Sequence, residues 1–261
     1  VAALRASPEY LGIAENRWES AFDRFHEELT VHLEEVAASL ARSADVVGIT
    51  TSLAQTFSSL SLARQIKLRS PAVKIVLGGA SVQAGSGLSV VREFAFVDYV
   101  IQGEGEEPLG LMLRAILENR NLDPATPGII TRETSMRTPF LEHRWEATDL
   151  DTLPVPDYDE YARKADQYSI IWNIPVEGSR GCWWDRVART GNPRDRCYFC
   201  NYAASTYREK TAALIGREVD FLARRYRNIR FAFCDYAVRP RGVTEMAEAV
   251  RRRWTKASTN L

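Results

Sequence analysis

The sequence lacks the features that mark several protein classes. Its 261 residues include only four cysteines, too few for the disulfide framework of a small secreted domain. No apolar run approaches the ~20 residues that cross a bilayer, and the first residues do not resemble a secretory signal. Lysine plus arginine equals aspartate plus glutamate, so no overall field favours nucleic acid or an anionic membrane. We therefore expect a cytoplasmic globular protein with no nucleic-acid or membrane partner.

Histidine is also scarce, with three residues in the chain and none between Asp45 and Arg132. This stretch therefore has no imidazole to offer a metal. His26 and His32 lie six residues apart, a spacing that does not put them on one helix face and excludes a zinc-protease helix. No G-x-G-x-x-G motif follows a predicted strand, so dinucleotide binding is poorly supported.

Short apolar segments alternate with amphipathic ones after a long helix predicted over residues 10–41. The predicted strands are 45–50, 74–79, 97–102 and 128–131. The predicted helices between them are 55–69, 86–93 and 106–119. This alternation predicts a doubly wound α/β domain, in which a parallel sheet is covered by helices on both faces.

Small and polar residues follow three of these strands, at the edge where ligands bind in open α/β sheets. They are Thr50, Thr51, Ser52, Gly78, Gly79, Ala80, Ser81, Gly103, Glu104 and Gly105. Such residues let a flat ligand approach the backbone. Any one of the glycines is explained by a tight turn alone, but three such strand ends in one sheet favour a ligand.

Three of the four cysteines lie in the stretch 178–210, which has almost no apolar periodicity. Cys197 and Cys200 form a C-x-x-C pair, and Cys182 precedes them by fourteen intervening residues. In a reducing compartment such thiols indicate metal binding or redox chemistry. Spacing alone leaves both an iron–sulfur cluster and a structural zinc open. The fourth thiol that zinc would need, Cys234, lies in an apolar run and is expected to be a buried strand residue.

The second half of the chain reads as strand, cysteine loop, helix and strand, over 170–176, 178–210, 212–226 and 228–235. This order predicts the start of a β/α barrel. Such a barrel needs about 200 residues, and only about ninety follow Ile170, so we expect a fragment. The predicted organisation is a helical lead-in (1–44), an α/β domain (45–148), a proline-punctuated linker (149–169) and a partial barrel (170–261).

Several motifs together resemble a known family. They are Ser179-Arg180-Gly181-Cys182-Trp183-Trp184, Cys197-Tyr198-Phe199-Cys200 and Tyr207-Arg208-Glu209-Lys210, with segments 78–81 and 96–106. The first three resemble the cluster loop of radical S-adenosylmethionine enzymes, more narrowly the cobalamin-binding branch that modifies ribosomally made peptides, often by C-methylation. The last two resemble the cobalamin-binding domain of that branch. One departure is the long gap after Cys182, where the common pattern has three residues.

The resemblance implies a [4Fe–4S] cluster held by Cys182, Cys197 and Cys200, with the fourth iron open to S-adenosylmethionine. Phe199 would pack near its adenine, and Arg208 and Lys210 would steady the charge of the cluster or of the carboxylate. Cobalamin would lie on the strand-end residues named above, without a protein histidine on its cobalt.

The implied activity is methylation of an unactivated carbon of a peptide, with a flavodoxin- or ferredoxin-like reductant. Two alternatives stay open. One is a cobalamin-dependent radical enzyme with other chemistry or a small-molecule substrate. The other is a non-catalytic zinc-containing binding domain that uses Cys234 as the fourth ligand.

Overall fold

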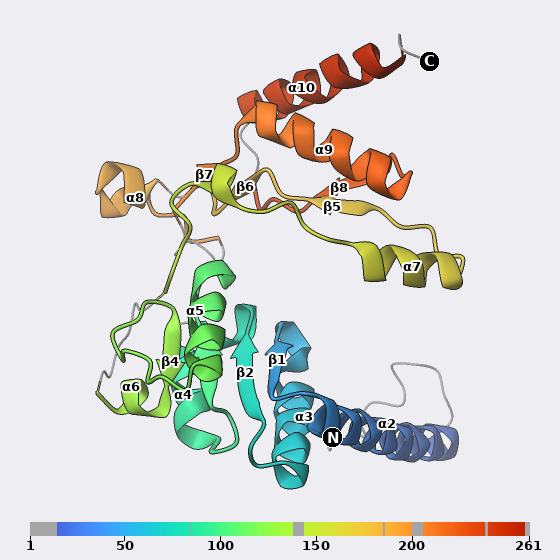
Figure 1. Ribbon diagram of the computed structural model, residues 1–261, viewed down its shortest axis with the longest axis vertical. Coiled ribbons are helices and arrows are strands. Elements are labelled where there is room, and N and C mark those ends of the chain that lie inside the picture. Colours follow the sequence, from blue (N-terminus) through green and yellow to red (C-terminus); the bar gives the residue numbers. More distant parts are fainter. Residues whose placement is uncertain are drawn as a thin grey trace. The chain divides into compact units, whose positions relative to one another are not determined.

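The computed structural model describes residues 15–83, 85–137, 144–184, 186–199, 206–237 and 240–258. Contacts within the chain divide it into two units, Val1–Glu146 and Ala147–Leu261. Figure 1 labels most of the helices and strands of the two units, which are described separately below. None of the described helices combines the length and apolar character that crossing a membrane requires.

The first unit follows the predicted alternation of strands and helices. Its elements are α2 (Glu15–Ser43), β1 (Val46–Thr50), the 3-10 turn η2 (Leu53–Gln55), α3 (Thr56–Arg69), β2 (Lys74–Gly78), η3 (Ala80–Val82), α4 (Gly85–Glu93), β3 (Tyr99–Ile101), α5 (Glu106–Leu117), β4 (Ile129–Thr131) and α6 (Arg132–Arg137). The four strands form one sheet in the order β1-β2-β3-β4, with β1, β2 and β3 parallel. The predicted α/β architecture is therefore confirmed.

Alternate residues of the strands divide between two apolar clusters, one on each face of the sheet. On one face, Ile75 and Leu77 of β2 pack with side chains of α2, α3 and α4. On the other face, Val76 of the same strand packs with Ile101 and with Met112 of α5. Because side chains of a strand alternate between faces, this division shows that α2, α3 and α4 cover one face and α5 covers the other.

The last strand departs from the expected parallel sheet. β4 pairs with β3 in the antiparallel sense, with Ile101 opposite Ile129. The backbone N–H of Gln102 donates to the carbonyl of Gly128 at 2.9 Å, so the chain enters β4 beside the carboxyl end of β3. The segment 118–127 has returned the chain to that end, and from there β4 can only run back along β3. An antiparallel strand at the edge of a parallel sheet is common in such folds.

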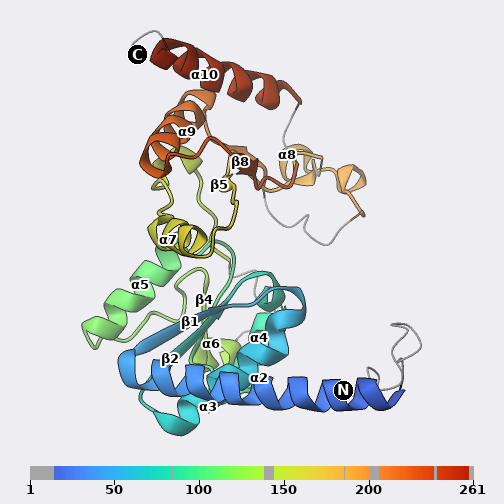
Figure 2. The same cartoon turned by 90° about the vertical axis from the view of Figure 1, so that its right-hand side faces the viewer.

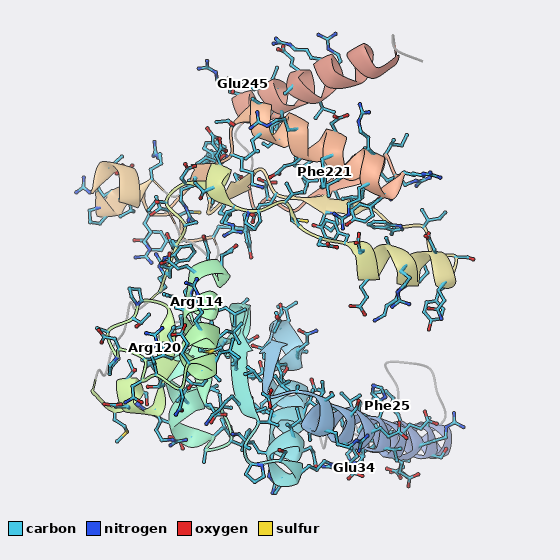
Figure 3. All side chains as sticks on the ribbon, viewed as in Figure 1. Phe25, Glu34, Arg114, Arg120, Phe221 and Glu245 are labelled. Atoms are coloured by element: carbon cyan, nitrogen blue, oxygen red, sulfur yellow. The ribbon has the colours of Figure 1, made fainter. Side chains whose placement is uncertain are left out.

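The first helix of the unit is anchored along only part of its length. Ala37 of α2 is fully buried in the cluster that also holds α3, with Leu40 and Ala41 packed beside it. The N-terminal part of α2 extends beyond this contact (Figure 2). Phe25, which projects from that part, is 60% exposed (Figure 3).

The second unit contains two parallel strands joined through the cysteine loop and a helix. Its elements are η4 (Leu150–Thr152), α7 (Asp159–Gln167), β5 (Ile174–Val176), β6 (Ser179–Arg180), α8 (Val187–Thr190), η5 (Pro193–Asp195), β7 (Arg208–Glu209), α9 (Ala212–Tyr226), β8 (Phe231–Phe233) and α10 (Pro240–Ser258). β5 and β8 pair in the parallel sense, with Pro175 opposite Ala232. A closed barrel is not part of the described structure, so the barrel stays a prediction.

The core of this unit lies between β5 and α9. Ile174 and Val176 of β5 pack against Ile215, Val219 and Leu222 of α9. The spacing of the helical residues places them on one face of α9, which explains the amphipathic pattern of its sequence. The strands are shorter than predicted. Residues 170 and 171, expected in the first strand, precede β5 and are mostly exposed.

The predicted linker is held along α9. At one end of the helix, the carboxylate of Asp151 accepts hydrogen bonds from the backbone N–H (2.8 Å) and the hydroxyl (2.7 Å) of Thr211, the N-cap residue. At the other end, Arg225 donates to Asp157 at 3.0 Å and to Asp159. The segment 151–159 is therefore a strap that follows α9 from its first turn to its last.

Aromatic residues reinforce the second attachment of this strap. The backbone N–H of Tyr158 donates to the Tyr226 hydroxyl at 2.7 Å, and the two rings lie edge to face at 6.2 Å. Arg225 also lies 6.0 Å from the ring centroid of Phe221, the α9 residue labelled in Figure 3. Cation–π contact and hydrogen bonds thus act on the same guanidinium.

We expect Asp151→Ala to lower the free energy of unfolding by about 1–2 kcal/mol, because two hydrogen bonds of a carboxylate are lost. The same change should speed proteolysis within 149–158, because the strap loses its hold on the start of α9. Urea unfolding and timed proteolysis check both effects. Asp166→Ala is the matched control, since the Asp166 side chain makes no hydrogen bond or ion pair with the described residues. Equal unfolding free energies and proteolysis rates in the two variants would contradict the attachment of the strap to α9.

Candidate cofactor site

The structure brings the predicted strand-end residues of the first unit to one edge. Thr50 ends β1 and Gly78 ends β2, while residues 103–105 connect β3 to α5. Because the three strands are parallel, the loops that follow them all lie at the carboxyl edge of the sheet. The edge is the position where a ligand of an α/β sheet binds.

Thr51 joins the first two loops. Its backbone N–H and its hydroxyl both donate to the carbonyl of Gly78, at 2.7 and 3.0 Å, and its own carbonyl accepts from the N–H of Ser81 at 3.2 Å. The residue is fully buried. The structure therefore gives Thr51 a role in fixing the loops to each other, whereas we expected a direct ligand contact.

Gln83 joins the second and third loops and was missed in the sequence. Its side-chain amide donates to the carbonyl of Gly79 at 3.0 Å, and its side-chain oxygen accepts from the N–H of Gly103 at 2.8 Å. One side chain thus uses both of its functional groups to tie two loops together. No periodicity or motif marks this glutamine, because its importance depends on a contact across twenty residues of sequence.

The third loop is held from its far side by Trp145. The backbones of Gly103 and Trp145 form an isolated parallel bridge, in which the N–H of Glu104 donates to the Trp145 carbonyl at 2.8 Å. Gly103 has φ +81°, and a Cβ at this position would lie less than 3.0 Å from the Trp145 carbonyl. Glycine is required here both by conformation and by the close approach of the second segment.

Gly79 is constrained in the same way in the second loop. Its φ is +96°, and a Cβ would lie less than 3.0 Å from the carbonyl oxygen of Thr51. The loops at this edge are therefore close-packed backbone, tied together by Thr51 and Gln83. Such a surface suits a flat ligand that contacts main chain and small side chains over a wide area.

We expect Gly79→Ala to lower the free energy of unfolding by about 1–3 kcal/mol, because the backbone there is disfavoured for any L side chain. The same substitution should weaken binding of hydroxocobalamin, since the loops must separate to admit the methyl group. Gly85→Ala is the matched control: outside its own helix, none of the described residues lies within 4 Å of a Cβ at Gly85, which begins α4. Urea unfolding and equilibrium dialysis measure the two quantities. A Gly79→Ala protein that behaves like the control would show that the edge is looser than described.

In the second unit, the cysteine loop has a closed stem. Ser179 pairs with Glu209 and Arg180 with Arg208, forming the short antiparallel ladder β6–β7. The N–H of Lys210 extends the ladder by donating to the carbonyl of Gly178 at 2.8 Å. The long segment that contains the cysteines therefore leaves and re-enters the fold at one place.

Asp235, just beyond β8, fixes this stem and was not predicted. Its carboxylate accepts from the N–H of Gly178 at 3.1 Å and from the hydroxyl of Ser179 at 2.5 Å. Two residues further along, Ala237 forms an isolated bridge with Cys182. The segment after β8 thus runs beside the first part of the loop and positions Cys182.

The predicted metal ligands are only partly described. Cys182 and Cys197 are both partly exposed with free thiols, as ligands of an added metal must be. Cys200 lies outside the described residues. Within the part of the chain that the structure describes, no three His, Cys, Asp or Glu side chains gather to hold a metal ion. The three-cysteine set therefore stays a prediction.

Cys234 is not the buried strand residue that we expected. β8 ends at Phe233, one residue earlier than the apolar run indicates, and the Cys234 thiol is exposed. Its N–H still bonds the Val176 carbonyl at 2.9 Å, so the thiol lies at the carboxyl end of the β5–β8 pair. Burial, and secondarily the neighbouring Cys234, raise the pKa of the Tyr158 hydroxyl.

The described part of the long gap between the first two cysteines of the loop forms two short helical turns. Arg186 and Asp195 close it with an ion pair at 3.1 Å. Between them, Gly191 caps the C-terminal end of α8 with φ +66°, and the Asn192 side chain accepts from the N–H of Arg194 at 3.1 Å to start η5. Helix-ending and helix-starting residues thus shape a segment that the sequence marks only as polar.

The residues predicted to bind S-adenosylmethionine have different surroundings. Phe199 is 95% exposed and is free to contact a ligand. Arg208 donates to the carbonyl of Thr206 at 2.9 Å and to that of Ala147. Lys210 is buried and donates to both carboxylate oxygens of Glu218 at 2.9 Å. This geometry does not support a cofactor contact by Lys210 and gives it a structural role between the loop and α9.

Lys210→Met alone should lower the free energy of unfolding by about 3–5 kcal/mol, because it leaves the buried Glu218 carboxylate without its partner. The double variant Lys210→Met/Glu218→Leu should recover most of the loss. Urea unfolding checks both. Lys164→Met is the control, because its ion pair with Glu160 is exposed and should contribute less than 1 kcal/mol. A loss for Lys210→Met no larger than the control would mean that the ammonium is available for another partner.

Comparison with known proteins supports part of this description. The model of the family described as B12 binding domain matches residues 16–113, a range that includes all three edge loops. Among solved structures, the chain is similar to the apo, selenomethionine-labelled cobalamin-dependent S-adenosylmethionine radical enzyme OxsB, with a TM-score of 0.58 and 15% identity. The similarity covers 83% of this chain and 30% of OxsB. No curated protein matches the sequence.

The first unit therefore contains a stretch that matches the B12 binding domain model, and the chain has a fold similar to part of OxsB. At 15% identity the likeness concerns the fold. The chain spans less than a third of the length of OxsB. The peptide-modifying branch, the cluster and the methyl transfer stay predictions.

Proposed function

We propose that the chain functions in a radical S-adenosylmethionine enzyme that uses cobalamin to methylate an unactivated carbon of a ribosomally made peptide. The observation that carries the proposal is the B12 binding domain match over residues 16–113, whose loops the structure ties together at one edge. The cysteine motifs of the second unit and the fold shared with OxsB support the radical part.

The first unit fits a large flat cofactor. Its edge presents main chain at Gly79 and Gly103, where a Cβ has no room. Thr51 and Gln83 hold these loops in one arrangement before any ligand binds, so less conformational freedom is lost on binding. No histidine lies between Asp45 and Arg132, so these residues would hold the cofactor without an imidazole on the metal.

The second unit fits a thiolate-bound cluster. Cys182 is positioned by the bridge to Ala237, and Asp235 fixes the stem that precedes it. Cys182, Cys197 and Cys200 would hold the cluster, and the exposed ring of Phe199 is free to pack against bound S-adenosylmethionine. When bound, the cluster and S-adenosylmethionine would supply abstraction of a hydrogen from an unactivated carbon. Cobalamin would supply the methyl group that replaces this hydrogen. The chain contributes position and shielding from water.

The finer parts of the proposal rest on the cysteine-loop motifs. Resemblance of the segments 179–184, 197–200 and 207–210 to the peptide-modifying branch supports a peptide substrate and methyl transfer. A flavodoxin- or ferredoxin-like protein would supply the electron, and the chemistry would require the reducing, oxygen-poor conditions of the cytoplasm. Product mass distinguishes methylation from other radical chemistry.

One observation favours a zinc-containing binding domain as a second candidate. Cys234 is exposed at the carboxyl end of β8, next to the Asp235 that holds the loop stem. A fourth thiol is thus available for a closed tetrahedral site.

The test is an anaerobic iron, sulfide and zinc assay of the full chain, after reconstitution with and without hydroxocobalamin. About four iron and four sulfide per chain, with broad absorption near 400 nm, are expected for a four-iron cluster. Cys197→Ala should lose this absorption, and Cys234→Ala should keep it. One zinc that is lost in Cys234→Ala, with no colour, would end the radical proposal and support the second candidate.

A further inference from the structure

Leu53 has an unusual backbone for its residue type. Its φ is +47°, the left-handed region that costs an L residue with a bulky side chain free energy. The other non-glycine residues with positive φ in the described chain are Asn119, Ser169 and Arg227. All three come directly after or within two residues of a helix end, where a left-handed residue ends a helix. Leu53 instead follows a strand and begins η2.

The hydrogen bonds around Leu53 fix its conformation. Before it, Thr51 is tied to Gly78 of the second loop. Across it, the N–H of Ser52 donates to the side-chain oxygen of Gln55 at 3.1 Å, and the N–H of Gln55 donates to the carbonyl of Ser52 at 3.0 Å. The unfavourable φ is therefore imposed by a closed turn on both sides.

The side chain of Leu53 does not pack in the described core, although its backbone is strained. Leu53 is 91% exposed, and Phe57, one helical turn further on, is 82% exposed. Glycine would adopt the same φ without cost. A strained and exposed apolar residue at a ligand-binding edge indicates a functional contact.

We propose that Leu53, with Phe57, forms the apolar contact for the corrin ring of cobalamin at the carboxyl edge of the sheet. The inference rests on the proposed cobalamin site, since both residues lie in the matched range 16–113 and two to six positions beyond Thr51. A corrin is a flat macrocycle fringed with methyl and methylene groups, so burying it against leucine and phenylalanine removes apolar surface from water on both sides. The strained turn holds Leu53 ready for this contact.

The test compares thermal unfolding with hydroxocobalamin binding in variants of the full chain. Leu53→Gly should raise the Tm of the cofactor-free protein by about 2 °C, because strain is relieved, and should weaken binding about tenfold, because an apolar contact is lost. Leu53→Ala keeps the strain and should weaken binding with little change in Tm. Leu53→Met should retain binding, because its side chain is apolar and of similar size.

Asn119→Gly is the matched control in the same unit, with φ +50° at an exposed position after α5. It should raise Tm slightly, by less than Leu53→Gly because asparagine tolerates this region better, and should leave the dissociation constant unchanged. Wild-type protein that binds no hydroxocobalamin would refute the proposed cobalamin site itself. Wild-type binding that is equally strong in Leu53→Gly and Leu53→Ala would refute only the role of Leu53.

Discussion

The parallel pairing of β1, β2 and β3 is the constraint on which the first unit depends. Parallel strands deliver their loops to one edge, and only that arrangement lets Thr51 reach Gly78 and lets Gln83 reach Gly103. The hydrogen bonds then convert three separate turns into one surface. Gly79 and Gly103, both with positive φ, allow the backbones to approach closely enough for these bonds to form. Ligand binding at this edge therefore depends first on the parallel direction of the strands, and only then on individual side chains.

The second unit uses a different principle to present its cysteines. Its two parallel strands are short, and the order of the loop depends on polar contacts at the stem. Asp235 holds the entry strand and Lys210, paired with Glu218, holds the exit. Both contacts are largely shielded from water, so each bond is worth more than it would be on the surface. The base of the cysteine loop is therefore fixed by these contacts before any group binds.

Sequence periodicity located β1 to β4, α2 to α5 and α9, and less closely β5 and β8, because burial of alternating or helically spaced side chains dominates their formation. It did not predict α6, α7 or α10. Composition also located the small residues at the sheet edge. It did not reveal Gln83, Asp235 or Glu218, since their roles depend on contacts between segments distant in sequence. The predictions of a parallel β4 and of a buried Cys234 were wrong for related reasons. Both depend on where a segment ends and not on its apolar pattern.

The strap along α9 has a mechanical consequence. Asp151 is bonded to Thr211, the residue that separates the exit of the cysteine loop from the first turn of α9. Tension applied to the chain ahead of residue 151 would be borne by the hydrogen bond from Arg208 of β7 to the Ala147 carbonyl and then at that junction, before it reached α7. The second attachment, at Arg225, would share the load along the helix axis. The end of the cysteine loop is thus the first point in this unit at which a pull on the preceding segment would be felt.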